Sequence, residues 1–387
     1  MTGNYLTSTE TFFFYVLVGV ASLFLMECAR EKRSVVNVEY QVNNAFSLKI
    51  SNIYIFLSFL VLFLVLATRD HVGTDYQQYV TTYGNISINS LSTGDIEWLK
   101  QSIAFWWICK ALSFFTSNYY YMFAVIGFIT LFYFYKAIIS VSCNWTYSLF
   151  LFLVFCLYYQ SFNQVRQVAA IAIVAYSYKF LKKENFKLFV TTVIVASLFH
   201  LSALVFIMAW FIRKIKINFK NIFIYMIVGV VFFLFFDKFI NLFSFISYIR
   251  TYSSSETYSM EYGMSTILNF IVRLLMYLGC LMFAKKTVAR AKYTVALYNI
   301  VAMCTILQIG AISFNIFGRI TTYFYIAYIF LIPEVLKTIR ELFSERDGIL
   351  IYIGSSLLLC IYNVVYYFSS AGAVAAGYSM YASILFK

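Results

Sequence analysis

The stretch that decides the fold is Ile50-Ser-Asn-Ile-Tyr-Ile-Phe-Leu-Ser-Phe-Leu-Val-Leu-Phe-Leu-Val-Leu-Ala-Thr68, an apolar run without a charged residue. A helix of this length crosses a hydrocarbon core of roughly 30 Å. Directly after it comes Arg69-Asp70-His71-Val72-Gly73-Thr74-Asp75-Tyr76-Gln77-Gln78-Tyr79, with a cation, two carboxylates and one of the chain's two histidines. Such a cluster is a candidate functional site, although membrane helices often end in polar residues and tyrosines for interfacial reasons alone.

Composition places the whole chain in a membrane. Of its 387 residues, 62% are hydrophobic, 21% are aromatic and only 12% are charged. Apolar runs recur along the whole length, and in lipid every backbone polar group must be satisfied within the protein, so these runs predict helices. We therefore expect an all-α, polytopic helical bundle that forms a single transmembrane domain over residues 1–387.

The net charge of +13 would suggest nucleic acid in a soluble protein. Here most Lys and Arg residues lie in short loops between apolar runs, which is the positive-inside pattern of membrane proteins. The seven cysteines are scattered without a CxxC pair, so they indicate neither a zinc site nor a disulfide framework. Walker, HExxH, GxSxG and Rossmann motifs are missing from the sequence. We expect no cofactor, no metal and no nucleic-acid partner.

The basic loops predict the topology. A basic loop after residues 11–29 should be cytoplasmic, which places the N-terminus outside and the cluster after Thr68 on the outer face. The loop 69–118 carries one apolar segment, Ser102–Phe115. The number of crossings between this outer loop and the cytoplasmic cluster around Lys182 must be odd, so we expect this segment to be an interfacial or re-entrant helix rather than a span. The predicted spans number about ten: 11–29, 50–68, 119–141, 145–162, 168–181, 221–243, 264–284, 293–313, 320–336 and 349–368.

The interval from Lys187 to Arg213 has basic clusters at both ends, so its crossings should be even in number. It is too short for two full spans. We predict a re-entrant hairpin of two half-length helices that meet near His200, and a single ordinary span is the alternative. A second outer-face loop is expected at 244–263. The last span leaves a small-residue tail, Ser369–Lys387, on the outer side.

A few arginines are left over once the cytoplasmic loops are counted, and they lie on the outer side or within the membrane. Positive residues there oppose the topology bias and need a reason. The guanidinium offers a planar fork of donors that suits phosphate oxygens, so the set predicts a cradle for a lipid-linked phosphate or pyrophosphate. Each could instead pair with a local carboxylate, as Arg69 could with Asp70. The set is Arg69, Arg166, Arg250, Arg273 and Arg319.

Acid–base candidates are few. Asp70, His71 and Asp75 lie in the cluster after the second span, and His200 lies at the proposed hairpin apex. A lone histidine in an apolar run is more often a structural hydrogen-bonding residue, but a polar break beside it favours a functional role.

Four short motifs stand between about residues 50 and 340: Arg69-x-x-x-Gly73-Thr74-Asp75-x-x-x-Tyr79, Asn163-x-x-Arg166-Gln167, Phe199-His200-x-Ser202-Ala203 and Phe317-Gly318-Arg319. In this order they resemble the motifs of the EpsG-like branch of the Wzy polysaccharide polymerases. The resemblance implies a multi-pass enzyme of the bacterial cytoplasmic (inner) membrane, of GT-C type. Such an enzyme joins oligosaccharide repeat units carried on undecaprenyl pyrophosphate into a surface polysaccharide, such as O-antigen of lipopolysaccharide, capsule or exopolysaccharide.

The resemblance also implies roles for particular residues. Arginines would stabilise the pyrophosphate leaving group, and a carboxylate or imidazole would deprotonate the acceptor hydroxyl. The expected partners are a lipid-linked donor and acceptor, membrane lipid, a chain-length regulator and a flippase. The assignments are Arg69, Asp75 and His200 as catalytic, Arg69, Arg166, Arg319, Arg250 and Arg273 for pyrophosphate, and Tyr76, Tyr79, Asn163, Gln167 and Tyr323 for sugar.

Three other functions compete with polymerisation. A flippase for the same lipid-linked oligosaccharide should place charges along a path through the bundle and show an internal repeat, which is not apparent here. A ligase would use the same donor with a different acceptor. A membrane O-acyltransferase would want a catalytic histidine open to the cytoplasm, whereas both histidines are expected outside or deep.

Overall fold

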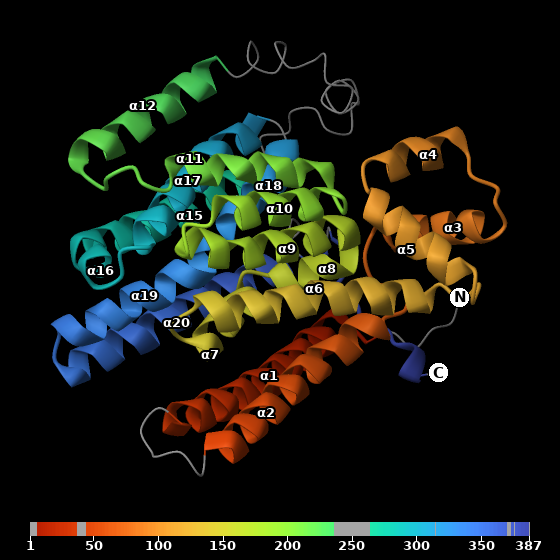
Figure 1. The fold of residues 1–387 in the computed structure, drawn as a ribbon, viewed down its shortest axis with the longest axis horizontal. Coiled ribbons are helices and arrows are strands. Elements are labelled where there is room, and N and C mark those ends of the chain that lie inside the picture. The colour runs from red at the N-terminus through yellow and green to blue at the C-terminus, as the bar shows by residue number, and fades with distance from the viewer. Residues whose placement is uncertain are drawn as a thin grey trace. The chain divides into compact units, whose positions relative to one another are not determined.

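The computed structural model of the chain describes residues 6–36, 44–235, 264–313, 315–369, 373–374 and 376–386 (Figure 1). Within these ranges all regular elements are helices, and extended pairing is confined to one bridge between Arg69 and Ser383. The all-α prediction is confirmed. The elements are α1 Ser8–Val36, α2 Asn44–Ala67, α3 Tyr76–Ser87, α4 Thr93–Lys100, α5 Ile103–Ser113, α6 Tyr120–Val141, α7 Trp145–Val154, α8 Leu157–Asn163, α9 Val165–Lys182, α10 Phe186–Ser197, η1 Leu201–Ile207, α11 Met208–Ile212, α12 Phe219–Leu234, α15 Met264–Met282, α16 Ala284–Arg290, α17 Thr294–Ser313, α18 Asn315–Tyr325, α19 Ala327–Leu342, α20 Glu345–Phe368 and η3 Ile384–Phe386.

The described helices make a multi-pass membrane protein. Six are long and apolar enough to cross a membrane, and the number rises to eight if two bent pairs each form one span. The pair α7–α8 is bent by 47° and the pair α15–α16 by 64°. Two further predicted spans coincide with α9, which carries three charged residues, and with α12, whose continuation beyond residue 235 lies outside the described residues. The count of ten spans therefore stays a prediction.

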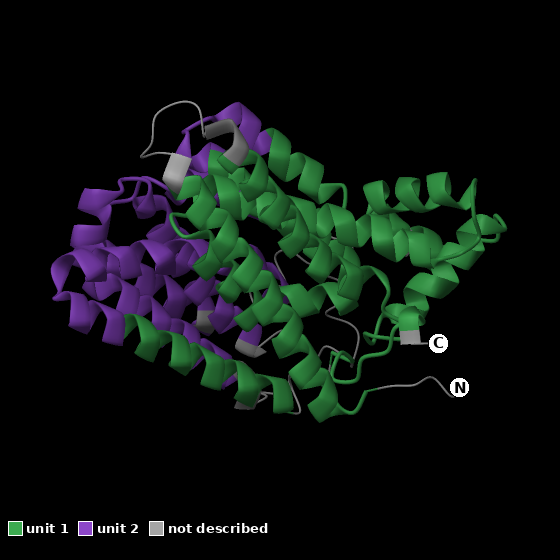
Figure 2. Cartoon of the chain, turned by 90° about the horizontal axis from the view of Figure 1, so that it is seen from below, with its two compact units in different colours: residues 1–179, 191–201, 351–387 green, residues 180–190, 202–350 purple. Residues whose placement is uncertain are grey.

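The chain divides into two compact units (Figure 2). Unit 1 comprises residues 1–179, 191–201 and 351–387, and unit 2 comprises residues 180–190 and 202–350. Unit 1 thus holds α1 to α8, most of α9 and α20, and the C-terminal tail. Unit 2 holds the start of α10, most of η1, α11, α12 and α15 to α19. The predicted outer loop 244–263, with Arg250, lies outside the described residues.

Small hydroxyl residues hold the first helices of unit 1 together. Ser22 of α1 and Ser58 of α2 lie with their hydroxyls 2.9 Å apart, and Tyr135 of α6 reaches Ser58 at 2.8 Å. In a membrane interior such residues let helices approach closely and bond across the contact. The contact holds α2 firmly, and the loop that begins at Arg69 continues directly from its end.

Three short helices, α3 to α5, fill the predicted outer loop. Ser92 and Asp95 form a capping box at the start of α4, and hydrogen bonds from Ser92 lower the pKa of the Asp95 carboxyl. α5 is the predicted interfacial helix. Trp107 in this helix is 59% exposed, and Phe114 and Phe115, which directly follow it, are 86% and 85% exposed, which suits a helix that lies in a membrane surface.

The interval from Lys187 to Arg213 is two half-length helical segments with a break at residues 198–200. Phe186, at the start of α10, contacts Trp210 of α11 with ring centroids 5.0 Å apart. Phe189, one turn later, contacts Phe206 of η1 at 5.9 Å. Because the start of the first segment meets the end of the second, the chain folds back as a hairpin.

We expect both ends of this hairpin to lie on the same side of the membrane. Lys183, before α10, and Lys216, after α11, are both exposed. In a variant without the native cysteines, Lys183→Cys and Lys216→Cys should react with an impermeant thiol reagent from the same side. Ser90→Cys, in the predicted outer loop, should react from the opposite side. Labelling of the two lysine positions from opposite sides would show a single span instead.

Candidate functional site

The C-terminal tail holds the loop that follows α2. Asp70 N donates to Ala382 O at 2.9 Å, and Gly73 N donates to Gly377 O at 2.8 Å. The two segments therefore pair along the whole loop, although the sequence predicted only a small-residue tail on the outer side. Small residues carry no apolar pattern, so this partner could not be found from the sequence. Further backbone bonds join Ile384 to Thr68 and Thr74 to Ala376.

Two glycines make this pairing possible. Gly73 has φ +105°, and a Cβ built there would lie 2.4 Å from Phe162 O. Gly377 has φ +71°, and its Cβ would lie 2.7 Å from Thr74 N. Both positions need a residue without a side chain, because the backbone conformation and the closeness of a second backbone each exclude one.

Asn163, the last residue of α8, joins the first motif to the second. Its side-chain oxygen accepts hydrogen bonds from Thr74 Oγ1 and from Asp75 N, both at 2.9 Å. Thr74 is exposed and Asp75 is half-buried. The proposed sugar ligand Asn163 therefore already orients the loop that carries Asp75.

Arg69 lies inside the protein beneath this loop, with only 1% of its surface exposed. It donates to Leu66 O, and its guanidinium carbon lies 4.3 Å from the ring centroid of Phe123 and 5.7 Å from that of Phe162. Its Nε and Nη2 have no hydrogen-bond partner among the described residues. Burial lowers the pKa of Arg69 to about 10, so the group remains a cation at neutral pH.

Arg166, at the start of α9, links the second motif to the outer helices. Its Nη1 donates to Ser102 Oγ at 2.7 Å, and it also hydrogen-bonds with Tyr79. Burial raises the pKa of the Tyr79 hydroxyl, and the nearby Arg166 opposes that rise. Arg166 is 7% exposed, so it too is largely enclosed.

The hairpin apex, which carries the third motif, reaches the same place in unit 1. Ala104 N donates to Leu198 O at 2.8 Å, and Leu201 N donates to Gln101 O at 3.2 Å. His200 lies between these two bonds in sequence and is 7% exposed. The apex is thus joined to the α4–α5 turn, next to the Ser102 that binds Arg166.

Asp70 and His71 form a pair that sequence reasoning did not emphasise. The Asp70 carboxylate is buried and accepts from Tyr120 OH at 2.9 Å and from Tyr76 OH at 3.3 Å. Its Oδ1 also lies 2.8 Å from Nδ1 of His71. Asp70 and His71 are neighbours in the sequence, whereas Tyr120 lies at the start of α6. Its hydrogen bond to Asp70 could not be predicted from the sequence.

Unit 2 has a polar cluster of its own around Arg273, in α15. This side chain hydrogen-bonds with Gln308 of α17 and lies 3.3 Å from Thr321 Oγ1 of α18. Its guanidinium also lies over the Tyr325 ring at 4.2 Å. These contacts tie three helices of unit 2 together around a cation.

The fourth motif leads into the same helix, α18. Arg319 is partly exposed, and Tyr323, one turn later, is fully buried. The hydroxyl of Tyr323 lies 3.0 Å from that of Ser202, a residue of the third motif. In unit 2, therefore, Ser202 of the third motif contacts α18, the helix that contains the fourth motif.

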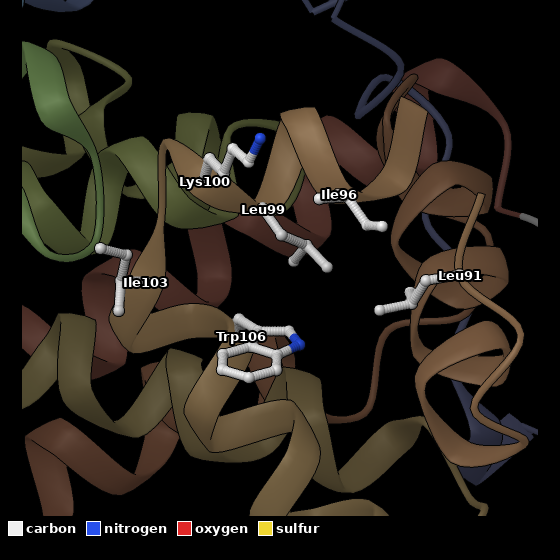
Figure 3. A pocket seen from close by; sticks show the side chains of 6 residues that line it. All are labelled: Leu91, Ile96, Leu99, Lys100, Ile103 and Trp106. Carbon is white, nitrogen blue, oxygen red and sulfur yellow. The ribbon is translucent and has the colours of Figure 1, made fainter. Parts of the chain in front are cut away.

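An apolar pocket of about 500 Å³ lies among the outer helices of unit 1 (Figure 3). The side chains of Leu91, Ile96, Leu99 and Trp106 point toward its middle in the close-up view, and Lys100 supplies a cation at its edge. Its size falls in the range of ligand pockets. The lining residues are Leu91, Ile96, Leu99, Lys100, Ile103 and Trp106.

Together these features define a multi-pass helical membrane protein. The loop after α2 carries two carboxylates, and buried arginines and tyrosines lie close to it. No group of three or more His, Cys, Asp or Glu residues that could hold a metal ion occurs in the part of the chain that is described. The sequence model of the EpsG family matches residues 52–383, so the chain belongs to the EpsG family, which is associated with membrane polysaccharide polymerases. Comparisons with curated proteins and with solved structures give no match.

We expect Gly377→Ala to lower the free energy of unfolding by about 1–3 kcal/mol, the usual cost of a strained backbone conformation. The matched control is Gly354→Ala in α20, where an added Cβ meets nothing within 4 Å. That change should be neutral or stabilising by up to about 1 kcal/mol, because alanine favours helix. Unfolding of the purified proteins in detergent measures both effects. Equal stability of the two variants would argue against the close tail–loop contact.

Proposed function

We propose that this protein is a membrane glycosyltransferase that polymerises lipid-linked oligosaccharide repeat units into a surface polysaccharide. The donor sugar is carried on undecaprenyl pyrophosphate at the periplasmic face, and the acceptor is a sugar hydroxyl on a second lipid-linked chain. The proposal includes a GT-C-like arrangement of about ten spans in the bacterial inner membrane.

One observation carries the proposal beyond family membership. Three motifs that lie far apart in the sequence are joined by hydrogen bonds in unit 1. Asn163 binds the loop at Thr74 and Asp75, and Arg166 binds Tyr79 and the α4–α5 turn. The hairpin apex binds that same turn through backbone groups. These contacts support one shared site rather than separate interfacial loops.

The cations of unit 1 suit a pyrophosphate leaving group. Negative charge builds up on the pyrophosphate as the glycosidic bond breaks, and preorganised donors in a dry site stabilise it strongly. We assign contact with the anion to Arg166, whose guanidinium lies at the α4–α5 turn and which is more exposed than Arg69. Arg69 is too deeply buried for contact in this conformation. It supports the site through its charge and by holding the loop from below.

The apolar pocket suits the isoprenoid chain of the same substrate. Lys100 and Ile103, two of its lining residues, flank the turn in which Ser102 binds Arg166. A pyrophosphate bound at Arg166 would therefore lie close to an apolar pocket that can take the isoprenoid chain. Because α5 exposes apolar side chains, we expect the pocket to open toward lipid rather than toward water.

The sugar site is proposed around the same loop. Tyr76 and Tyr79 are each 2% exposed, so they shape the site by packing rather than by stacking on sugar in this conformation. Thr74, Gln77 and Gln78 are exposed and offer hydrogen bonds to sugar hydroxyls. The sequence assigned the base role to Asp75 or His200, and both lie within this part of unit 1.

Unit 2 retains two candidates for a lipid-linked anion. Arg273 and Arg319 are both half-buried, and Arg273 binds Gln308 and Thr321. We propose Arg319 as a ligand. Arg273 has the further role of holding α18 in place.

Replacing Arg166 by Ala should lower the polymerisation rate by about 10²–10³-fold, the usual effect of removing one donor to a developing oxyanion. Arg319→Ala should act similarly, and Arg69→Ala should act through the loop. Arg30→Ala, which removes a cation paired with Glu27 on α1, is the control and should keep full activity.

The measurement is reconstitution with a purified lipid-linked repeat unit. It follows a ladder of products and the release of isoprenoid pyrophosphate. Transport by the wild-type protein without a ladder would show a flippase, and one transfer to an unrelated acceptor would show a ligase. A full ladder from all three arginine variants would contradict the assigned roles.

Filling the pocket should weaken binding of the isoprenoid chain. Ile96→Trp should raise KM for the long-chain donor by at least about tenfold, since two lost buried methylene groups cost roughly 1.6 kcal/mol. A donor with only two isoprene units should be used equally well by the variant and the wild type. Ile88→Trp, at a 72% exposed position that does not line the pocket, is the control. An unchanged KM for the long chain would place that chain elsewhere.

A further inference from the structure

His71 stands in an unusual backbone conformation within the loop that the tail holds. Its φ is +55°, in the left-handed region that residues other than glycine seldom enter. Such strain persists where the surrounding structure maintains it, often at active sites. Here the neighbouring Asp70 is held by its backbone bond to the tail, so the loop keeps His71 in this conformation.

The His71 ring is oriented by a buried carboxylate. Nδ1 lies 2.8 Å from Oδ1 of Asp70, whose side chain is only 5% exposed, whereas that of His71 is 37% exposed. Tyr120 and Tyr76 donate to the same carboxylate oxygen, and the Tyr76 ring stacks on the imidazole with centroids 5.2 Å apart. The carboxylate selects the tautomer with a proton on Nδ1, which leaves a lone pair on Nε2.

The other end of the ring is open. Nε2 of His71 has no hydrogen-bond partner among the described residues, and the side chain reaches the surface of unit 1. A buried acid, an oriented imidazole and a free nitrogen are the parts of an acid–base dyad. By comparison, His200 is only 7% exposed.

We propose that His71 is the general base of the reaction and that Asp70 is its positioning residue; this rests on the proposed glycosyl transfer. Nε2 takes the proton of the acceptor hydroxyl while that oxygen bonds to the anomeric carbon of the donor. The bond from this carbon to the pyrophosphate oxygen breaks, and its electron pair leaves with the lipid pyrophosphate. The imidazolium, stabilised by Asp70, then returns its proton to solvent.

The dyad shares its loop with the rest of the site. Tyr76 packs on both His71 and Phe123, and Phe123 also lies beneath the Arg69 guanidinium. Gly73 and Thr74, two and three residues further on, are bound to the tail and to Asn163. The base is therefore part of the same rigid loop that carries the exposed Thr74.

The test uses the purified full chain in the reconstitution assay, with the rate of ladder formation as readout. His71→Asn should lower kcat by about 10²–10⁴-fold, the usual contribution of a general base, with little change in KM. Asn tolerates the left-handed conformation, so the loop should survive the change. Asp70→Asn should lower kcat by a smaller factor, since it favours the wrong tautomer.

Two further readouts separate a base from a structural residue. His71→Gly also accepts the positive φ, and added imidazole should restore part of its rate. The wild-type kcat should show the acid limb expected of a reaction with a general base, and that limb should be lost in His71→Asn. The groups that face the ring are Asp70 and Tyr76, with Tyr120 behind the carboxylate. Burial raises the pKa of the Tyr76 hydroxyl, so this group stays protonated across the acid limb.

The outcomes are distinct from those of the proposed function. If the wild-type protein forms no ladder and releases no isoprenoid pyrophosphate, the proposed function fails, and the base role fails with it. If the wild type is active and His71→Asn keeps its kcat and its acid limb, the base role alone is overturned. An inactive His71→Gly that imidazole does not restore, together with a raised KM in His71→Asn, would likewise overturn it in favour of a structural role.

Discussion

The approach of Gly73 to the end of α8 is the constraint on which the rest of the site depends. At this point the loop after α2 passes so close to Phe162 that no side chain fits between the two backbones. The same approach brings Asn163 within hydrogen-bond distance of the loop and leaves its other side open to the tail. A single close contact between backbones thus orders segments from three distant parts of the chain.

Beneath this contact lies a charge with few polar partners. Arg69 is enclosed by Phe123 and Phe162, and only one of its nitrogens has a hydrogen-bond partner among the described residues. Aromatic faces and one carbonyl offset part of the cost of burying a cation. Because little solvent screens it, its field extends into the site more strongly than that of a surface arginine. Arg69, which the sequence predicted to be a phosphate ligand, is thus enclosed within the protein rather than exposed at its surface.

Sequence patterns predicted the features that depend on local composition. The helical class followed from apolar runs, and the hairpin between residues 187 and 213 followed from the basic clusters at its ends. The pairing of Arg166 with Ser102, the role of Tyr120 at Asp70 and the glycine contact at Gly377 were not predictable. Each of these depends on a partner distant in sequence, and neither hydropathy nor spacing encodes such a partner. His71 was named as a candidate but given little weight, since its backbone conformation is visible only in the structure.

The tail has a consequence for when the site can form. Ser383 meets Thr68 across 315 positions of the sequence. At the usual rate of synthesis, roughly a quarter of a minute to a minute separates the appearance of the two segments. During that time the loop has left the ribosome but the tail has not been made, so no partly made chain can hold the loop in its final conformation. The loop thus reaches its final conformation late in the biogenesis of the protein, after all the helices that precede the tail have been made.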